Sequence, residues 1–216
     1  MEPLRIIAET PAGFASADPW SPAIEGILAY WQLREELGEE EFALGMTGHR
    51  PLVEARRLPL ATESDGEHWW WVASMPIYEL RAEYLRWYHR RFDTQLAERY
   101  ADTRKVLVTA GPYKNYRNAA TVHLTPQVEW HVIGDRAEIE RLLRRCTAIG
   151  AKIGRGLGQV RRWTVTPDGA DERLARLHRP LPVEYASRHG VTGMVLTWGI
   201  RPPVRAREHQ ALCVLP

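Results

Sequence analysis

Hydrophobic residues follow strand-like and helix-like spacings in the first third of the chain. The apolar run 3–10 predicts a strand, and the Pro-, Gly- and Ser-rich residues 11–22 predict a loop. Ser21 is the expected N-cap of a following helix, with Pro22 at its first position. We expect close packing to require Gly26 inside this helix, because glycine is a poor helix former. The helix presents one apolar face, formed by Ile24, Ile27, Leu28 and Trp31.

The pattern is weaker in the middle of the chain. Residues 35–65 contain an acidic run and several Gly and Pro residues, and predict an irregular insertion. Residues 68–76 are rich in β-formers, and we expect their tryptophans, Trp69–Trp71, to lie in the core. Residues 77–92 fit two structures equally well. They form either an amphipathic helix with Trp87 inward, or a strand with arginines outward.

A capped helix is the clearest local signal. Residues 105–110 and 127–133 predict strands, the second with Val128, Trp130 and Val132 on one side. Asp135 and Glu138 then have the spacing of a capping box, and Gly150 is the expected end of the helix. Its apolar face is formed by Ile139, Leu142, Leu143, Cys146 and Ile149.

The order of these elements predicts an α+β fold. A strand at 159–166 completes the order strand, helix, strand, strand, helix, strand, which is typical of a ferredoxin-like core with an antiparallel sheet. Further strands are expected at 193–200 and at the chain end. We therefore expect one ferredoxin-like domain over 1–166, interrupted by insertions at about 35–65 and 77–125, with 167–216 as a C-terminal β extension packed on it.

The composition is that of a soluble protein. The 216 residues are 44% hydrophobic and 26% charged, and no apolar stretch approaches the ~20 residues of a membrane span. The N-terminus lacks the features of a signal peptide. Cys146 and Cys213 lie far apart in the sequence and define no disulfide framework. We expect a cytoplasmic protein with no membrane contact.

Charge is distributed unevenly along the chain. Residues 1–76 carry thirteen acidic residues against five arginines, whereas 77–163 carry seventeen basic residues against nine acidic ones. Two surfaces for two kinds of partner are expected, with Glu39–Glu41 facing a basic neighbour. Arginine far outnumbers lysine, which suits RNA binding because arginine both pairs with phosphate and stacks on bases. A GC-rich genome would produce the same bias.

A glycine-rich loop follows the capped helix. Its glycines are Gly150, Gly154, Gly156 and Gly158, with Lys152 and Arg155 between them. A P-loop and a dinucleotide fingerprint both precede a helix, so neither fits. The spacing fits two structures: backbone N–H groups approaching an RNA phosphodiester, or a tight structural turn.

The stretch IGAKIGRGLGQVRRWTV resembles the glycine-rich loop and following strand of the CRISPR-associated RAMP superfamily. IEGILAYW is similar to the first helix of those proteins, and GPYKNYRNAATVHLTPQVEWHVIGD to their central basic segment. The resemblance covers 3–34 and about 111–166. Length and loop position are most similar to the Cas-five-like subunit of a type IV effector complex.

The resemblance implies a non-catalytic subunit that binds and caps the 5′ handle of CRISPR RNA. It also implies docking to a Cas-seven-like backbone subunit and a large Cas-eight-like subunit, and contact with target DNA beside the protospacer follows by analogy. A basic thumb-like insertion would separate handle from spacer. No cofactor or metal is expected. The expected RNA-binding residues are Lys152, Gly154, Arg155, Gly156, Gly158, Arg161, Arg162, Lys114, Tyr116, Arg117, Arg86, Trp87, Arg90 and Arg91.

Two other function classes stay open. Related superfamily members cut CRISPR RNA without metal, and His89 and His123 lie in the basic region as candidates for such acid–base chemistry. The 58 residues after the glycine loop count against this ribonuclease, because in processing members the loop lies nearer the C-terminus. The third class is a protein-interaction module without RNA.

Overall fold

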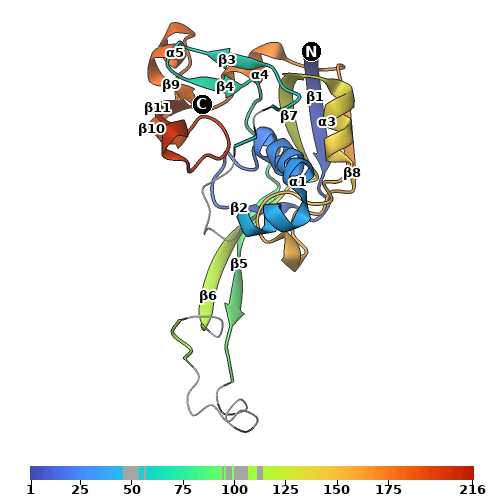
Figure 1. Ribbon diagram of the computed structural model, residues 1–216, viewed down its shortest axis with the longest axis vertical. Helices are drawn as coiled ribbons and strands as arrows, with labels where there is room; N and C mark the ends of the chain where they lie inside the picture. The colour runs from blue at the N-terminus through green and yellow to red at the C-terminus, as the bar shows by residue number, and fades with distance from the viewer. Residues whose placement is uncertain (46–53, 56, 94, 96–98, 100–106, 111–113) are drawn as a thin grey trace.

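The core of the protein is a three-stranded antiparallel sheet in the order β7-β1-β8. The computed structural model describes residues 1–216 except 46–53, 56, 94, 96–98, 100–106 and 111–113. The sheet strands are β1 (Glu2–Glu9), β7 (Gln127–Gly134) and β8 (Arg162–Thr166). The helices α1 (Ile24–Gly45) and α3 (Arg136–Leu143) lie beside them (Figure 1). Alternate side chains of β1 point into this core, and Leu4, Ile6 and Ala8 are fully buried.

A short segment runs along the free edge of β7. The N–H of Ser74 donates to the carbonyl of His131 at 2.8 Å, and Ile77 and Glu129 exchange hydrogen bonds at 2.8 and 2.9 Å. Residues 72–77 therefore occupy a fourth position beside β7 without forming a continuous strand. They follow the hairpin of β3 (Thr62–Ser64) and β4 (Trp69–Trp71). Trp70 and Trp71 are buried, which confirms the expectation that they belong to the core.

Helix α1 differs from the prediction at both ends. Ser21 does not cap it, because its hydroxyl donates to Asp18 Oδ2 at 3.2 Å, and the helix begins at Ile24. The predicted apolar face is confirmed, with Ile24 and Leu28 fully buried. The helix continues to Gly45 with a kink at Gly38, so the irregular insertion expected at 35–65 is wrong for residues 35–45.

For the predicted capped helix, which is α3, the expected start is confirmed and the expected end is wrong. Asp135 accepts a hydrogen bond from the N–H of Glu138 at 3.2 Å, as expected for an N-cap. The predicted apolar face is buried. The helix ends at Leu143 rather than near Gly150. The reason is that the chain turns back on itself, where Ile149 N–H donates to Gly158 O at 2.9 Å.

A long hairpin projects from the body of the molecule as an arm (Figure 1). Its strands are β5 (Ala82–Arg90) and β6 (Tyr116–Leu124), and β2 (Phe14–Ser16) pairs with the base of β6. The alternative of a helix at 77–92 is therefore wrong, and Trp87 is 50% exposed rather than turned inward. Of the strand expected at 105–110, residues 108–110 are bends, residue 107 has no regular secondary structure, and residues 105–106 lie outside the described residues.

The C-terminal part forms a second antiparallel sheet, in the order β10-β11-β9. Its strands at 193–200 and at the chain end were expected, whereas its short helices were not. Arg179 joins this part to the core: it donates to the carbonyls of Trp71 and Ala73, and to that of Ile200 at 2.6 Å. The elements are α4 (Glu172–Leu177), β9 (Leu181–Pro182), α5 (Val183–Arg188), β10 (Met194–Gly199), β11 (Gln210–Leu215) and the 3-10 turns Ile153–Arg155 and Arg207–His209.

The antiparallel sheets and separate helices confirm a mixed α+β structure. Among the described helices, none has the length and apolar character that crossing a membrane requires.

Candidate nucleic-acid interface

The outer glycines of the glycine-rich loop are required by packing. A Cβ on Gly158 would lie 1.8 Å from the carbonyl oxygen of Ile149, and one on Gly150 would lie 2.5 Å from that of Ala15. The loop is tied to β2, because Ala151 N–H donates to Ala15 O at 2.8 Å. Packing therefore requires glycine at these two positions, as the interpretation of a tight structural turn expects.

The middle of the loop has no such packing requirement. A Cβ on Gly154 would meet no heavy atom of the described residues within 4 Å, and its φ is not positive, unlike that of Gly156 at 81°. Lys152 has φ 59° and is the one non-glycine residue with positive φ in the described part of the chain. Arg155 is exposed, and within that same part its guanidinium has no hydrogen bond or ion pair. This stretch therefore presents open backbone and two cations to solvent.

The glycine-rich loop rests on the base of the arm. Leu157 packs against Ala15 and Val122, in a cluster that includes Tyr88. Lys152 Nζ lies 5.9 Å from the centroid of the Tyr88 ring. The hydroxyl of Tyr88 is buried and has no hydrogen-bond partner among the described residues. Loop and arm thus meet at a cation–aromatic contact with an unsatisfied polar group.

The arm has two faces, because successive side chains of a strand alternate. We call the face that carries Tyr88 the loop-side face. Arg86 lies on it, with its Cζ 5.5 Å from the Tyr88 ring centroid. Farther along the same face, Arg90 and its cross-strand partner Tyr116 form a second pair at 5.5 Å. These side chains extend the cationic and aromatic surface of the loop outward along the arm.

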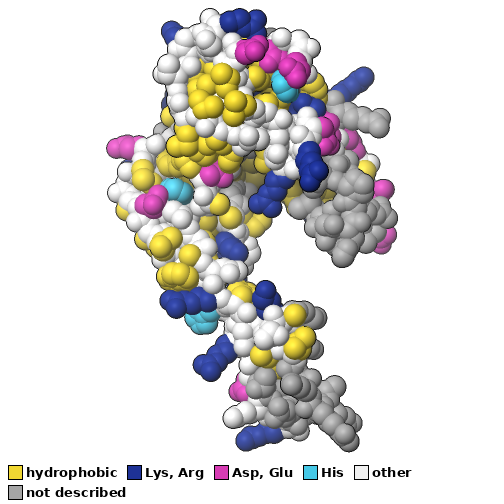
Figure 2. Space-filling view, turned by 90° about the vertical axis from the view of Figure 1, so that its left-hand side faces the viewer, with side chains coloured by type: hydrophobic (Ala, Val, Ile, Leu, Met, Phe, Trp, Pro, Cys, Tyr) yellow, Lys and Arg dark blue, Asp and Glu magenta, His cyan; other side chains and the backbone are white. Residues whose placement is uncertain are grey.

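Other predicted residues lie on the opposite face or at the far end. Arg117 and Trp87 form a pair on the opposite face, with the guanidinium carbon 4.3 Å from the ring centroid. Arg91 follows the end of β5, and the carbonyl of Lys114 accepts from Arg90 Nη2 at 2.9 Å. Figure 2 shows lysine and arginine side chains spaced along the arm. The structure therefore does not gather all predicted residues on one surface.

Two further predicted arginines are held by a carboxylate that the sequence did not single out. Glu9 Oε2 accepts from Arg161 Nε at 2.8 Å, and Glu9 Oε1 lies 2.5 Å from Arg162 Nη2. The hydrogen bond from Arg161 is the main cause that lowers the pKa of Glu9, and Arg162 adds to it. In contrast to Arg155, these two cations are already paired within the protein.

The two candidate catalytic histidines lie far apart. His123 is 6% exposed, and its ring stacks on Phe14 with the centroids 5.3 Å apart. Its cross-strand partner is Glu83, six positions along β5 from the exposed His89. Six residues of strand span about 20 Å, so the two imidazoles cannot act together on one phosphodiester. Of the described residues, no group of three His, Cys, Asp or Glu side chains could hold a metal ion.

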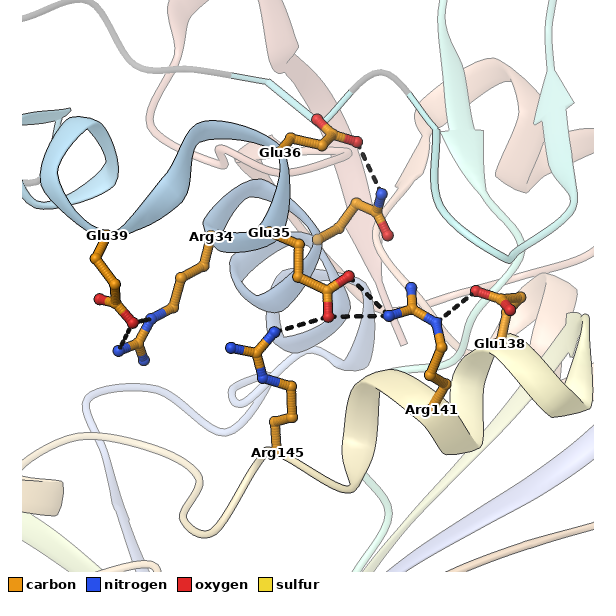
Figure 3. Close-up of polar contacts among 8 residues, drawn as sticks. Arg34, Glu35, Glu36, Glu39, Glu138, Arg141 and Arg145 are labelled. Carbon is orange, nitrogen blue, oxygen red and sulfur yellow. Dashed lines mark hydrogen bonds and ion pairs between the residues drawn. The ribbon is translucent and has the colours of Figure 1, made fainter.

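The acidic part of α1 pairs with arginines of its own protein (Figure 3). Glu35 accepts from Arg141 Nη1 at 2.7 and 2.9 Å and from Arg145 Nη1 at 2.7 Å. The Arg141 hydrogen bond is the main cause that lowers the pKa of Glu35. Glu39 accepts from Arg34 Nε at 2.7 Å. This network ties α1 to α3 and the residues that follow it, and it turns Arg141 of α3 and Arg145, two residues beyond α3, toward α1.

The family model of the CRISPR type IV associated protein Csf3 matches residues 2–216 of the chain. None of the curated proteins matches the chain.

Proposed function

The chain belongs to the Csf3 family of type IV CRISPR-associated proteins, and we propose that it is the RNA-binding subunit of a type IV effector complex. In this role it binds and caps the 5′ handle of CRISPR RNA and has no catalytic activity. Its protein partners are a Cas-seven-like backbone subunit and a large Cas-eight-like subunit. Contact with target DNA beside the protospacer remains an expectation by analogy.

One observation carries the proposal: the open middle of the glycine-rich loop adjoins the loop-side face of the arm. Lys152, Arg155 and the paired side chains of β5 and β6 form one run of cations and aromatic rings. Single-stranded RNA is held by such surfaces, since cations neutralise the backbone and rings stack on unpaired bases. The exposed backbone of Gly154 would let a phosphodiester approach closely.

The strand order supports a ferredoxin-like core of the RAMP type. In that arrangement the first strand lies between the third and the fourth, and the second strand borders the third. Here β1 lies between β7 and β8, and residues 72–77 border β7 at the position of the second strand. The projecting arm corresponds to the thumb-like insertion, and we propose that it separates handle from spacer.

The proposal is tested by replacing both loop cations. Lys152→Ala with Arg155→Ala should weaken binding of a single-stranded CRISPR repeat RNA and flatten its salt dependence. Each lost phosphate contact lowers the slope of log K against log salt by about 0.7, so we expect a change of about 1.4.

Arg173→Ala with Arg207→Ala is the matched control. It removes the same charge from two exposed residues of the C-terminal part, on α4 and on the 3-10 turn before β11. An unaltered slope in the loop variant, or an equal change in both variants, would mean that the glycine-rich loop is only a structural turn.

A further inference from the structure

A cleft of about 660 Å³ lies beside the glycine-rich loop. Its walls are the first half of α1, the residues after β2, and the segment 146–151 that leads into the loop. Clefts of about 300–1,000 Å³ are typical of sites for small molecules and cofactors. The cleft therefore has room for a nucleotide-sized group.

Gly26 of α1 lines this cleft and has no packing role. An added Cβ would meet no heavy atom of the described residues within 4 Å, so the close packing expected from the sequence is wrong. Its backbone is helical, and glycine is among the poorest helix formers. Because Gly26 has no side chain, the space in front of it remains part of the cleft.

One end of the cleft is aromatic. The rings of Tyr30 and Trp31 meet edge to face, with centroids 5.2 Å apart. The guanidinium groups of Arg34 and Arg145 lie 5.1 and 5.3 Å from the Trp31 ring centroid. Both arginines are held by the glutamates of the network in Figure 3. The Trp31 ring is thus fixed in place, as a wall for a flat apolar group requires.

The other end of the cleft is polar and fixed in geometry. Ser16 Oγ donates to the carbonyl of Asp18 at 2.6 Å, and Asp18 Oδ1 accepts from the N–H of Trp20 at 3.0 Å. Ser21 Oγ donates to Asp18 Oδ2. Carboxylate and hydroxyl oxygens have further lone pairs, so they can accept from the edge of a heterocycle lying against the apolar walls.

The cleft opens next to the cations of the loop. Gly150, Ala151 and Ile153 line it, and Lys152 lies between them in sequence. A group inside the cleft would therefore be continuous with a phosphate held at Lys152 and the open backbone of Gly154. A base attached to a charged backbone has this combination of a flat apolar part and an adjacent anion.

We propose that this cleft takes one unpaired nucleobase of the RNA whose backbone lies on the glycine-rich loop; the inference rests on the proposed function. The base enters between Gly26 and the aromatic end, and its polar edge faces Asp18 and the two serines. The cleft thereby fixes the position of the RNA along the loop.

The test combines an obstructed cleft with an RNA that lacks one base at a time. Gly26→Leu places a bulky side chain in the cleft, and it should preserve folding because leucine is a better helix former than glycine. Gln32→Leu is the control, since Gln32 lies on the same helix but does not line the cleft. The probes are single-stranded CRISPR repeat RNAs with an abasic residue at each successive position, and thermal melting checks that each variant folds.

We expect wild-type protein and Gln32→Leu to lose affinity at least about fivefold at one abasic position, as expected for a stacked base. In Gly26→Leu the intact RNA should bind more weakly, and the penalty at that one position should disappear. A penalty that persists in Gly26→Leu would overturn the inference while leaving the proposed function intact.

Two other outcomes would also overturn it. If Gly26→Leu binds RNA normally but fails to assemble with its protein partners, the cleft holds a partner side chain instead of a base. If the wild-type protein binds none of the RNAs, the proposed function fails together with the inference.

Discussion

Glu9 provides a sharp test of how the arginines beside the glycine-rich loop are used. Its side chain is only 16% exposed, and it pairs with both Arg161 and Arg162. A phosphate that binds these guanidinium groups must therefore compete with a carboxylate that is already in place. Glu9→Gln keeps the shape of the side chain and removes its charge, so both arginines become available to RNA.

The expected effect is a steeper salt dependence. Each additional phosphate contact to single-stranded RNA steepens the slope of log K against log salt by about 0.7, so two arginines add about 1.4. Glu9→Gln should bind RNA more tightly than wild type at low salt. Over a fourfold rise in salt, from about 50 to 200 mM, its advantage should shrink about sevenfold.

The assay is fluorescence anisotropy of a labelled CRISPR repeat RNA at four salt concentrations. Glu63→Gln is the control, because Glu63 is a similarly covered carboxylate (18% exposed) that pairs with Arg176 in another part of the protein. The control should leave slope and affinity unchanged. A slope for Glu9→Gln equal to or shallower than that of wild type would refute the reasoning, because Glu9 would then not compete with RNA.

Further predictions concern the loop glycines and two ion pairs. In thermal melting, Gly158→Ala should lower the Tm, because its Cβ would clash with backbone, whereas Gly154→Ala should keep the Tm and weaken RNA binding. Arg179→Met should lower the free energy of unfolding by about 3–5 kcal/mol in urea titrations, because it leaves Glu25 buried without its counter-charge. Glu35 has a folded pKa below its unfolded value, so its contribution to stability is present above the unfolded pKa and is lost as pH falls through the folded one. Glu35→Gln should therefore be less stable at pH 7 and lose less stability on acidification, measured by urea titration at each pH.

Helices and strands that are determined by residues close together in the sequence could be predicted. The N-cap at Asp135 acts on a residue three positions away, and the alternation in 127–133 describes a strand with one buried side. The arm could not be assigned, because the apolar residues of 77–92 fit a helix face as well as a strand. Pairing of β5 with β6 makes most of this segment a strand rather than a helix, and this pairing joins segments that are distant in the sequence.

The candidate site was predictable as a set of residue types rather than as an arrangement. Glycine spacing alone cannot distinguish Gly158, which packing requires, from Gly154, which has open space. The pairing of Glu9 with Arg161 joins residues 152 positions apart, so no local pattern indicates it. Trp87 and Arg90 lie on opposite faces of the arm because 82–90 is a strand, and the sequence did not distinguish this strand from a helix.

The most direct test of RNA binding without cleavage is a gel assay of the purified protein with a 5′-labelled CRISPR repeat RNA in the absence of metal. We predict a shifted complex and no product. A discrete product at one repeat position would contradict the non-catalytic role and make His89 and His123 the first residues to replace. Absence of any shift, both for the protein alone and for the protein co-expressed with its complex partners, would contradict RNA binding itself.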